Sequence, residues 1–142
     1  MIILDTDHIS LLQYPGSPEG QRVERRLAAS PDRDIRTTVI TVEEQLRGWL
    51  AVIARYRDPR QQMAYYDKLI AFIRFFSTWS ILPLRESAVQ AIRDLRQASL
   101  RIATTDLKIA AIAMANQATL LSRNLRDFEQ VPGLQVEDWT RS

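Results

Sequence analysis

The sequence predicts an α/β fold, with a central parallel sheet of about four or five strands and helices on both of its faces. Short runs of β-branched and other apolar residues alternate along the chain with longer segments whose apolar residues recur at helical spacing. The first run, residues 2–4, is Ile-Ile-Leu, and the second, residues 35–40, consists of Ile, Arg, Thr and Val. Strands that alternate with helices in this way are typical of parallel sheets, because each connection must cross back over the sheet.

Local signals at the ends of each segment define the expected elements. Asp7 is placed to cap the first helix, Thr41 opens a long helix, and Asp58-Pro59 ends it. The result is a helical hairpin, about residues 41–78, inserted between the second and third strands. The expected strands are residues 1–5, 35–40, 80–82, 119–122 and 134–136, and the expected helices are residues 9–13, 19–29, 41–56, 60–78, 86–99, 104–116 and 124–129.

The composition indicates a single domain, residues 1–142, and excludes several classes of function. With 46% hydrophobic and 25% charged residues, the chain is expected to build one core. There is no cysteine, which excludes disulfides, thiol nucleophiles and zinc–thiolate sites. No Gly-rich phosphate-binding loop occurs. The N-terminus does not resemble a signal peptide and no apolar run is long enough to span a membrane, so we expect a cytoplasmic protein.

Acidic and amide side chains follow several of the expected strands. Open parallel sheets bind ligands beyond the carboxyl ends of their strands, so these side chains are candidates for one site. Repelling carboxylates are costly without a cation between them, and an all-oxygen set suits Mg²⁺ or Mn²⁺. The candidates are Asp5 after the first strand, Glu43 and Glu44 after the second, Asp106 at the start of the Ala-rich helix, and Asn124 and Asp127 after the fourth strand.

Structural interpretations of the same residues remain open at this point. Asp5 could cap a turn, although a carboxylate directly after Ile-Ile-Leu favours a function. Glu44 fits a capping box in which it bonds back to the amide of Thr41. Asp106 stands where the helix dipole favours an anion, and Asp127 fits a solvated helix position.

Two further residues near the first strand also have structural interpretations. Asp7 fits a helix N-cap better than a metal ligand. His8 is the only histidine, which excludes a two-histidine ribonuclease mechanism, and it fits packing or hydrogen bonding better than catalysis.

Four motifs, in order, resemble those of PIN-domain ribonucleases. Ile-Ile-Leu-Asp5-Thr-Asp resembles the opening motif, and the Glu four residues before Gly48 resembles the second, which selects Glu44 over Glu43. Asp106-Leu-Lys-Ile-Ala-Ala resembles the third motif, and Leu-Ser-Arg-Asn124-Leu-Arg-Asp-Phe resembles the fourth. The ending, residues 131–139, is similar to that of VapC-type toxins from bacterial toxin–antitoxin pairs. The resemblance therefore extends from residue 2 to residue 139.

The resemblance implies an Mg²⁺- or Mn²⁺-dependent endoribonuclease that hydrolyses RNA. Asp5, Glu44 and Asp106 would be the metal-binding and catalytic acids. The fourth acidic position of many PIN domains falls on Asn124 or is served by Asp127, so these two are also candidate catalytic residues. The candidate substrate-binding residues are Thr6 and Arg123.

The same resemblance implies partners, and it leaves rival interpretations. VapC-type toxins are homodimers held inactive by a small cognate antitoxin, and no membrane is involved. One rival is an inactive PIN-like module that only binds RNA or a partner. The other is a haloacid-dehalogenase-type phosphatase that would use Asp5 and Asp7, but that family also needs a lysine, and neither Lys68 nor Lys108 is placed for it.

Overall fold

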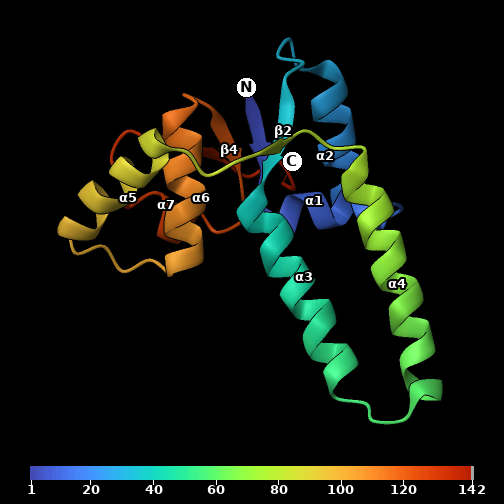
Figure 1. The fold of residues 1–142 in the computed structure, drawn as a ribbon. Coiled ribbons are helices and arrows are strands. Elements are labelled where there is room, and N and C mark those ends of the chain that lie inside the picture. The colour runs from blue at the N-terminus through green and yellow to red at the C-terminus, as the bar shows by residue number, and fades with distance from the viewer. Residues whose placement is uncertain (142) are drawn as a thin grey trace.

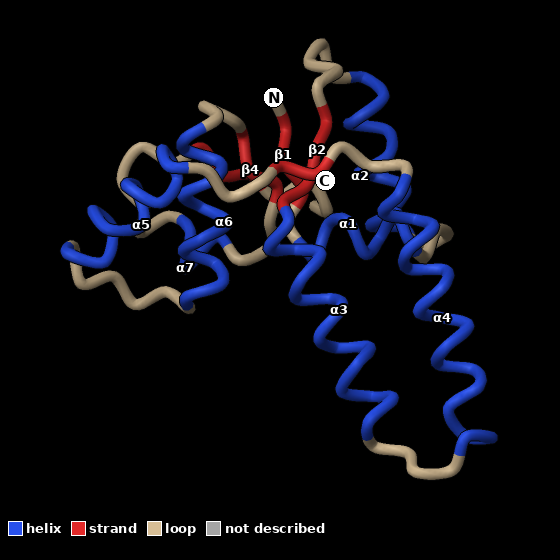
Figure 2. Tube along the Cα trace, in the orientation of Figure 1, coloured by secondary structure: helices blue, strands red, loops and turns tan. Residues whose placement is uncertain are grey.

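The computed structural model describes residues 1–141 and has a five-stranded, all-parallel sheet with the strand order β3-β2-β1-β4-β5. Figures 1 and 2 show the strands at the centre of the molecule and the helices around them. The predicted fold class is thus confirmed. The strands are β1 (Ile2–Leu4), β2 (Ile35–Thr38), β3 (Ile81–Leu82), β4 (Thr119–Leu121) and β5 (Gln135–Glu137).

Helices cover both faces of the sheet. α5, α6 and α7 lie on one side of the strands, and α1, α2 and α4 lie on the other (Figure 1). The helices are α1 (Thr6–Gln13), α2 (Pro18–Ala29), α3 (Val39–Ala54), α4 (Pro59–Ser77), α5 (Glu86–Gln97), α6 (Thr104–Ala115) and α7 (Leu125–Phe128).

The apolar residues of β1 divide between two hydrophobic clusters. Ile3 belongs to the cluster that includes the buried residues of α5 and α6, whereas Ile2 and Leu4 belong to the cluster that includes Val23 of α2 and Phe72 of α4. Successive side chains of a strand point to opposite faces, so an apolar run without alternation is what a strand covered on both faces requires.

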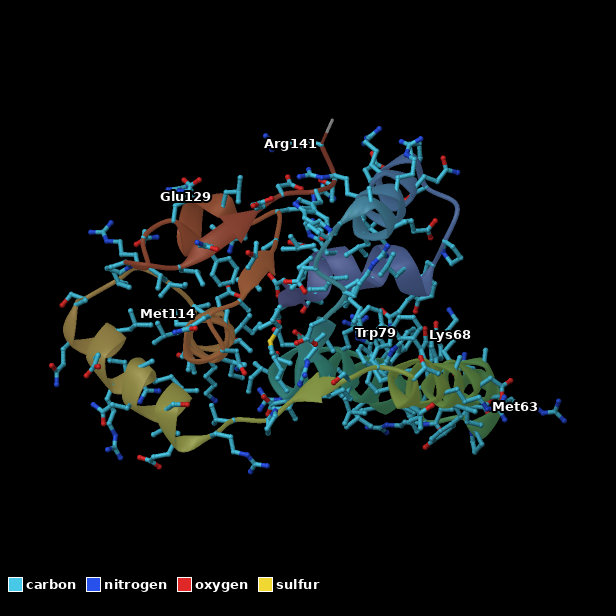
Figure 3. The ribbon with its side chains drawn as sticks, turned by 90° about the horizontal axis from the view of Figure 1, so that it is seen from above. Met63, Lys68, Trp79, Met114, Glu129 and Arg141 are labelled. Atoms are coloured by element: carbon cyan, nitrogen blue, oxygen red, sulfur yellow. The ribbon has the colours of Figure 1, made fainter. Side chains whose placement is uncertain are left out.

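Helices α3 and α4 form the hairpin between β2 and β3, and they extend away from the sheet (Figure 1). In the view of Figure 3, Met63 lies toward the far end of this hairpin, opposite Met114 and Glu129. Phe72 and Phe76 of α4 are buried, but Leu50, Ile70 and Ile73 are exposed. The hairpin therefore packs only in part against the core.

Two predicted helix starts are wrong. The first helix begins at Thr6, because the Asp5 carboxylate accepts a hydrogen bond from the Thr6 amide at 2.7 Å, so Asp5 is the N-cap in place of Asp7. The long helix α3 begins at Val39, because the Thr38 hydroxyl accepts from the Thr41 amide at 3.1 Å. The β-branched residues at 39–41 favour a longer strand in the sequence, but the helix cap at Thr38 ends the strand two residues before its predicted end.

Within the described part of the chain, no helix combines the length and the apolarity needed to cross a membrane.

Candidate active site

The candidate site lies where β1 and β4 end side by side. Their registers align Leu4 with Leu121, and the Asp5 amide donates to the Leu121 carbonyl at 2.9 Å. The strand order runs outward in opposite directions from this pair, through β2 on one side and β5 on the other. Such a switch point opens a crevice at the carboxyl ends of the strands. The residues that follow, Asp5 and Ser122, therefore project into the same region.

Asp5 is almost completely buried, with 6% of its surface exposed. One carboxylate oxygen accepts from the Thr6 amide at 2.7 Å, and the other accepts from the Ser122 hydroxyl at 2.8 Å. The pKa of Asp5 is raised to about 6, chiefly by burial and then by the nearby charge of Asp7, although the bonds from Ser122 and Thr6 act to lower it. A helix cap alone would not require a carboxyl group with so little access to water.

Glu44 projects from α3 toward the same region. Its pKa is raised to about 7, chiefly by burial and then by the charges of Asp5 and Asp106. Its Oε1 is buried and has no hydrogen-bond partner among residues 1–141. The capping-box interpretation is wrong, because the Thr41 amide bonds to the Thr38 hydroxyl instead. No structural hydrogen bond to Oε1 therefore offsets the repulsion between Glu44 and the neighbouring acids.

Asp106 lies in the first turn of α6, as predicted. Burial raises its pKa, and the charge of Asp127 contributes next. The side-chain amide of Asn124 donates to Asp106 at 3.3 Å and to Asp127 at 3.0 Å. Asp127 is partly buried and takes part in this arrangement, so a freely solvated position is the wrong description of it. Asn124 thus joins the two carboxylates that flank it.

Electrostatic effects connect the three candidate acids. Asp5 and Asp106 both raise the pKa of Glu44, and Asp106 raises that of Asp5. Even so, within residues 1–141 no three acidic or histidine side chains close tightly enough around one point to enclose an ion. The arrangement is an open acidic site in which an ion would keep much of its own water shell.

The two candidate substrate-binding residues flank these acids. The Oγ1 of Thr6 is buried and, within the described chain, has no hydrogen-bond partner. Arg123 is exposed, and its backbone amide donates to Asp7 at 2.9 Å. One residue therefore offers a free hydroxyl next to Asp5, and the other offers a guanidinium on the rim.

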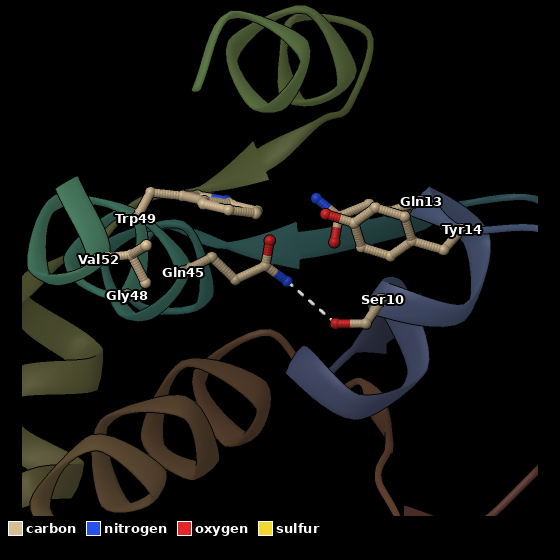
Figure 4. A pocket seen from close by; sticks show the side chains of 7 residues that line it. All are labelled: Ser10, Gln13, Tyr14, Gln45, Gly48, Trp49 and Val52. Atoms are coloured by element: carbon tan, nitrogen blue, oxygen red, sulfur yellow. Dashed lines mark hydrogen bonds between the residues drawn. The ribbon is translucent and has the colours of Figure 1, made fainter. Parts of the chain in front are cut away.

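A groove lies between α1 and α3, and no sequence motif indicated it. It has a volume of about 330 Å³ and begins at Gln45, the residue after Glu44. Figure 4 shows Tyr14 and Trp49 lining it and the bond from the Gln45 side-chain amide to the Ser10 hydroxyl, which measures 3.3 Å. Its walls come from segments that are distant in sequence, so no local motif could reveal it.

The PIN-domain family model matches residues 2–134. This chain therefore belongs to the PIN-domain family. The family match, together with the sheet order and the acids at its edge, favours the nuclease interpretation over the phosphatase interpretation.

Curated relatives and solved structures agree with this assignment. The chain is 40% identical over 48 residues to Ribonuclease VapC2 of Rickettsia felis, and 36% identical over 74 residues to Ribonuclease VapC1 of the same organism. These matches cover 34% and 49% of this chain and only 36% and 55% of the relatives.

Similarity to solved structures extends over the whole fold. The structure of VapBC-1 from nontypeable Haemophilus influenzae matches with a TM-score of 0.72 and 22% identity over 99% of this chain and 100% of that one. VapBC-5 from Mycobacterium tuberculosis, a member of a family of toxin–antitoxin systems, matches with a TM-score of 0.62 and 21% identity over 96% of this chain and 94% of that one. At these identities the likeness establishes the fold.

Proposed function

We propose that this protein is a metal-dependent endoribonuclease and the toxin component of a type II toxin–antitoxin system. One observation carries the proposal. Asp5, Glu44 and Asp106, from three separate elements, meet at the switch point of the sheet, where burial and nearby acidic charges raise the pKa of all three. Clusters of perturbed carboxylates in a crevice are typical of functional sites. The names of the curated relatives support ribonuclease activity.

The chemistry of these residues fits a divalent cation. All donors are oxygen atoms, which suits Mg²⁺ or Mn²⁺ better than softer metals. The unpartnered Glu44 Oε1 is a ligand atom without a competing bond. A cation among the acids would also stabilise their charged forms, which burial now disfavours. Asp5, Glu44 and Asp106 are the residues that would hold it.

The side chains around the acids have separate roles in hydrolysis. A bound divalent cation supplies charge stabilisation to a phosphodiester and lowers the pKa of water. Ser122 orients Asp5, and Asn124 orients Asp106 and Asp127, through the bonds described above. The Thr6 hydroxyl is free to bond a phosphate oxygen or a water molecule. Arg123 on the rim is placed to contact an RNA phosphate.

We further propose the partners that accompany this class. VapBC-1 and VapBC-5 carry names of toxin–antitoxin pairs. By analogy, this chain forms a homodimer that a small cognate antitoxin inhibits. The exposed apolar residues of the α3–α4 hairpin provide surface for such contacts.

The test is cleavage of end-labelled small RNA by purified, antitoxin-free protein with Mg²⁺ or Mn²⁺. Parallel reactions contain EDTA, or the variants Asp5→Asn, Glu44→Gln and Asp106→Asn. We expect discrete cuts that require the metal and disappear in each variant. Asp94→Asn on the exposed face of α5 is the matched control, because it removes a carboxylate away from the site.

The opposite outcomes are equally specific. Cutting that persists with EDTA or in Asp106→Asn would contradict metal-dependent hydrolysis by this site. Folded wild-type protein that binds Mn²⁺ and cuts no RNA pool would support the alternative, a PIN-like module that only binds RNA or a partner.

A further inference from the structure

We infer that His8 and Asp7 are positioning residues that fix the loop of residues 122–124 against the catalytic acids. This inference rests on the proposed function. His8 is buried, and its ring nitrogens bond to Asp7 and Trp139 and not to Asp5, Glu44 or Asp106, so hydrolysis does not use it directly. Its ring instead connects the C-terminal segment around Trp139 to Asp7, and Asp7 in turn connects to the loop.

The hydrogen bonds of His8 determine which ring nitrogen carries the proton. The ring is fully buried, with 0% exposed. Its Nε2 accepts from the backbone amide of Trp139 at 3.1 Å, so Nε2 must present a lone pair. The proton of the neutral ring is therefore on Nδ1, which donates to Asp7 Oδ1 at 2.7 Å. The Trp139 amide thus selects the tautomer that can hold Asp7.

Asp7 transfers this constraint to the loop. Its second oxygen, Oδ2, accepts from the Arg123 amide at 2.9 Å and lies 3.3 Å from the Ser122 hydroxyl. Ser122 donates to Asp5 at 2.8 Å and accepts from the Asn124 amide at 3.1 Å. The loop that orients Asp5 and carries Asn124 is therefore bonded to one carboxylate, and His8 holds that carboxylate in place.

The C-terminal segment is itself anchored to α2. Trp139 is buried in the cluster that includes Val23, and the Arg26 guanidinium lies 4.5 Å from the centre of its ring. Arg22 donates to the Thr140 carbonyl at 2.7 Å. Because both ends of the chain of bonds are fixed, the His8 ring has a single arrangement in which all of its polar atoms are satisfied.

Packing alone does not explain a histidine at this position. An aliphatic side chain could fill the same space, but it would leave the Trp139 amide and Asp7 Oδ1 without their hydrogen-bond partner. Residues that hold a metal-binding group from behind commonly affect affinity or activity by about 10- to 100-fold. Asp7 and His8 hold the Ser122–Asn124 loop in this way.

Two substitutions of His8 each keep one of its two hydrogen bonds and remove the other. In His8→Asn the side-chain NH₂ can replace Nδ1 and donate to Asp7, but the bond to Trp139 is lost. In His8→Gln the side-chain oxygen can replace Nε2 and accept from Trp139, but the bond to Asp7 is lost. Both remove one buried hydrogen bond and similar ring contacts, so a purely structural role predicts similar effects.

The test compares wild type with both variants in amide hydrogen exchange of Arg123, in Mn²⁺ affinity, and in kcat and KM for RNA cleavage. The expected result is faster Arg123 exchange and an about 10- to 100-fold lower kcat or Mn²⁺ affinity in His8→Gln, with substantial rescue in His8→Asn. Equal losses in the two variants, or unchanged Arg123 exchange in His8→Gln, would overturn the inference.

Asp7→Asn provides a second variant if His8→Gln does not fold. The amide side chain keeps the shape of the carboxylate, but it cannot accept from both the His8 ring and the Arg123 amide. Faster Arg123 exchange in this variant supports the inference, and unchanged exchange contradicts it. Because exchange and Mn²⁺ binding do not depend on RNA cleavage, a wild-type protein that cuts no RNA would refute the proposed function and leave this test intact.

Discussion

The segment from Asp5 to His8 has two sides with opposite electrostatic character. On the side of Asp5, burial and like charges raise the pKa of the carboxyl groups, and the side chains of Glu44 and Thr6 each keep a buried atom without a partner. On the side of Asp7 and His8, both carboxylate oxygens of Asp7 and both ring nitrogens of His8 have a hydrogen-bond partner. Four consecutive residues therefore contain both a part of the acidic site and its hydrogen-bonded support.

This difference shows how the fold tolerates the acidic site. Unpaired buried groups destabilise a protein, and they persist where the surrounding structure determines their positions. Here the support is a set of bonds between α1, the loop after β4 and the C-terminal segment. The acids can then remain ready for a cation instead of rearranging to find other partners.

The largest effect is expected from Asp5→Asn, which removes a charge from the unsatisfied side. Cleavage should fall to the level measured with EDTA, a loss of more than about 100-fold, or more than about 2.7 kcal/mol of activation free energy. The measurement is the initial rate of RNA cleavage. Asp94→Asn should retain the wild-type rate, and a similar loss in both variants would show that Asp5 has no special role.

The stability of the metal-free protein should depend on pH through the ionisation of Asp5. The pKa of Asp5 is raised from 3.8 to about 6, so its full contribution to stability is present below about pH 4 and is lost as the pH rises through about 6. The loss is about 3 kcal/mol for a shift of this size. Urea unfolding should show that Asp5→Asn gains stability relative to wild type between pH 4 and pH 7.5. A constant difference between the two proteins over this range would contradict the raised pKa.

Asn124→Ala tests the connection between the two sides, because Asn124 lies in the supported loop and donates to Asp106 and Asp127. We expect cleavage to fall about 10- to 100-fold, or about 1.4 to 2.7 kcal/mol, with little change in thermal stability. Asn116→Ala is the control, since Asn116 bonds to the α6 backbone at the end of the helix far from Asp106. Unchanged cleavage in Asn124→Ala would remove Asn124 from the site.

Arg123→Ala should have the smallest effect, because Arg123 lies on the solvent-exposed rim. We expect KM to rise a few-fold and the slope of log affinity against log salt to decrease by about 0.7, the value for one contact with single-stranded nucleic acid. Arg126, also exposed, provides the control substitution to Ala. Equal salt slopes for wild type and Arg123→Ala would place Arg123 outside the RNA contact.

Features encoded in short segments could be predicted from the sequence. The apolar run before Asp5 predicted a doubly covered strand, and the helix and strand alternation predicted the parallel sheet. The motif spacing selected Glu44 instead of Glu43, and the charges of Asp5 and Asp106 act on the pKa of Glu44. The strand and the choice of Glu44 depend on neighbours within a few residues, and the parallel sheet depends on the order of segments along the chain.

Features formed by distant segments could not be predicted in the same way. The bond between Asp7 and Arg123 joins residues 116 positions apart, and that between His8 and Trp139 joins residues 131 positions apart. With those partners unknown, Asp7 looked like a helix cap. The strand order brings them together, and spacing along the chain carries no information on it.

Proton release on cation binding tests the central claim, that a divalent cation offsets the repulsion among these acids. Mn²⁺ would be titrated calorimetrically at pH 6.5 in two buffers of different ionisation enthalpy. With pKa values of about 6 for Asp5 and about 7 for Glu44, binding should release about one proton per ion, because the ligands must ionise. The release should decrease toward zero at pH 8.5 and should be smaller in Asp5→Asn. Binding without proton release at pH 6.5, or equally strong binding by Asp106→Asn, would contradict the account.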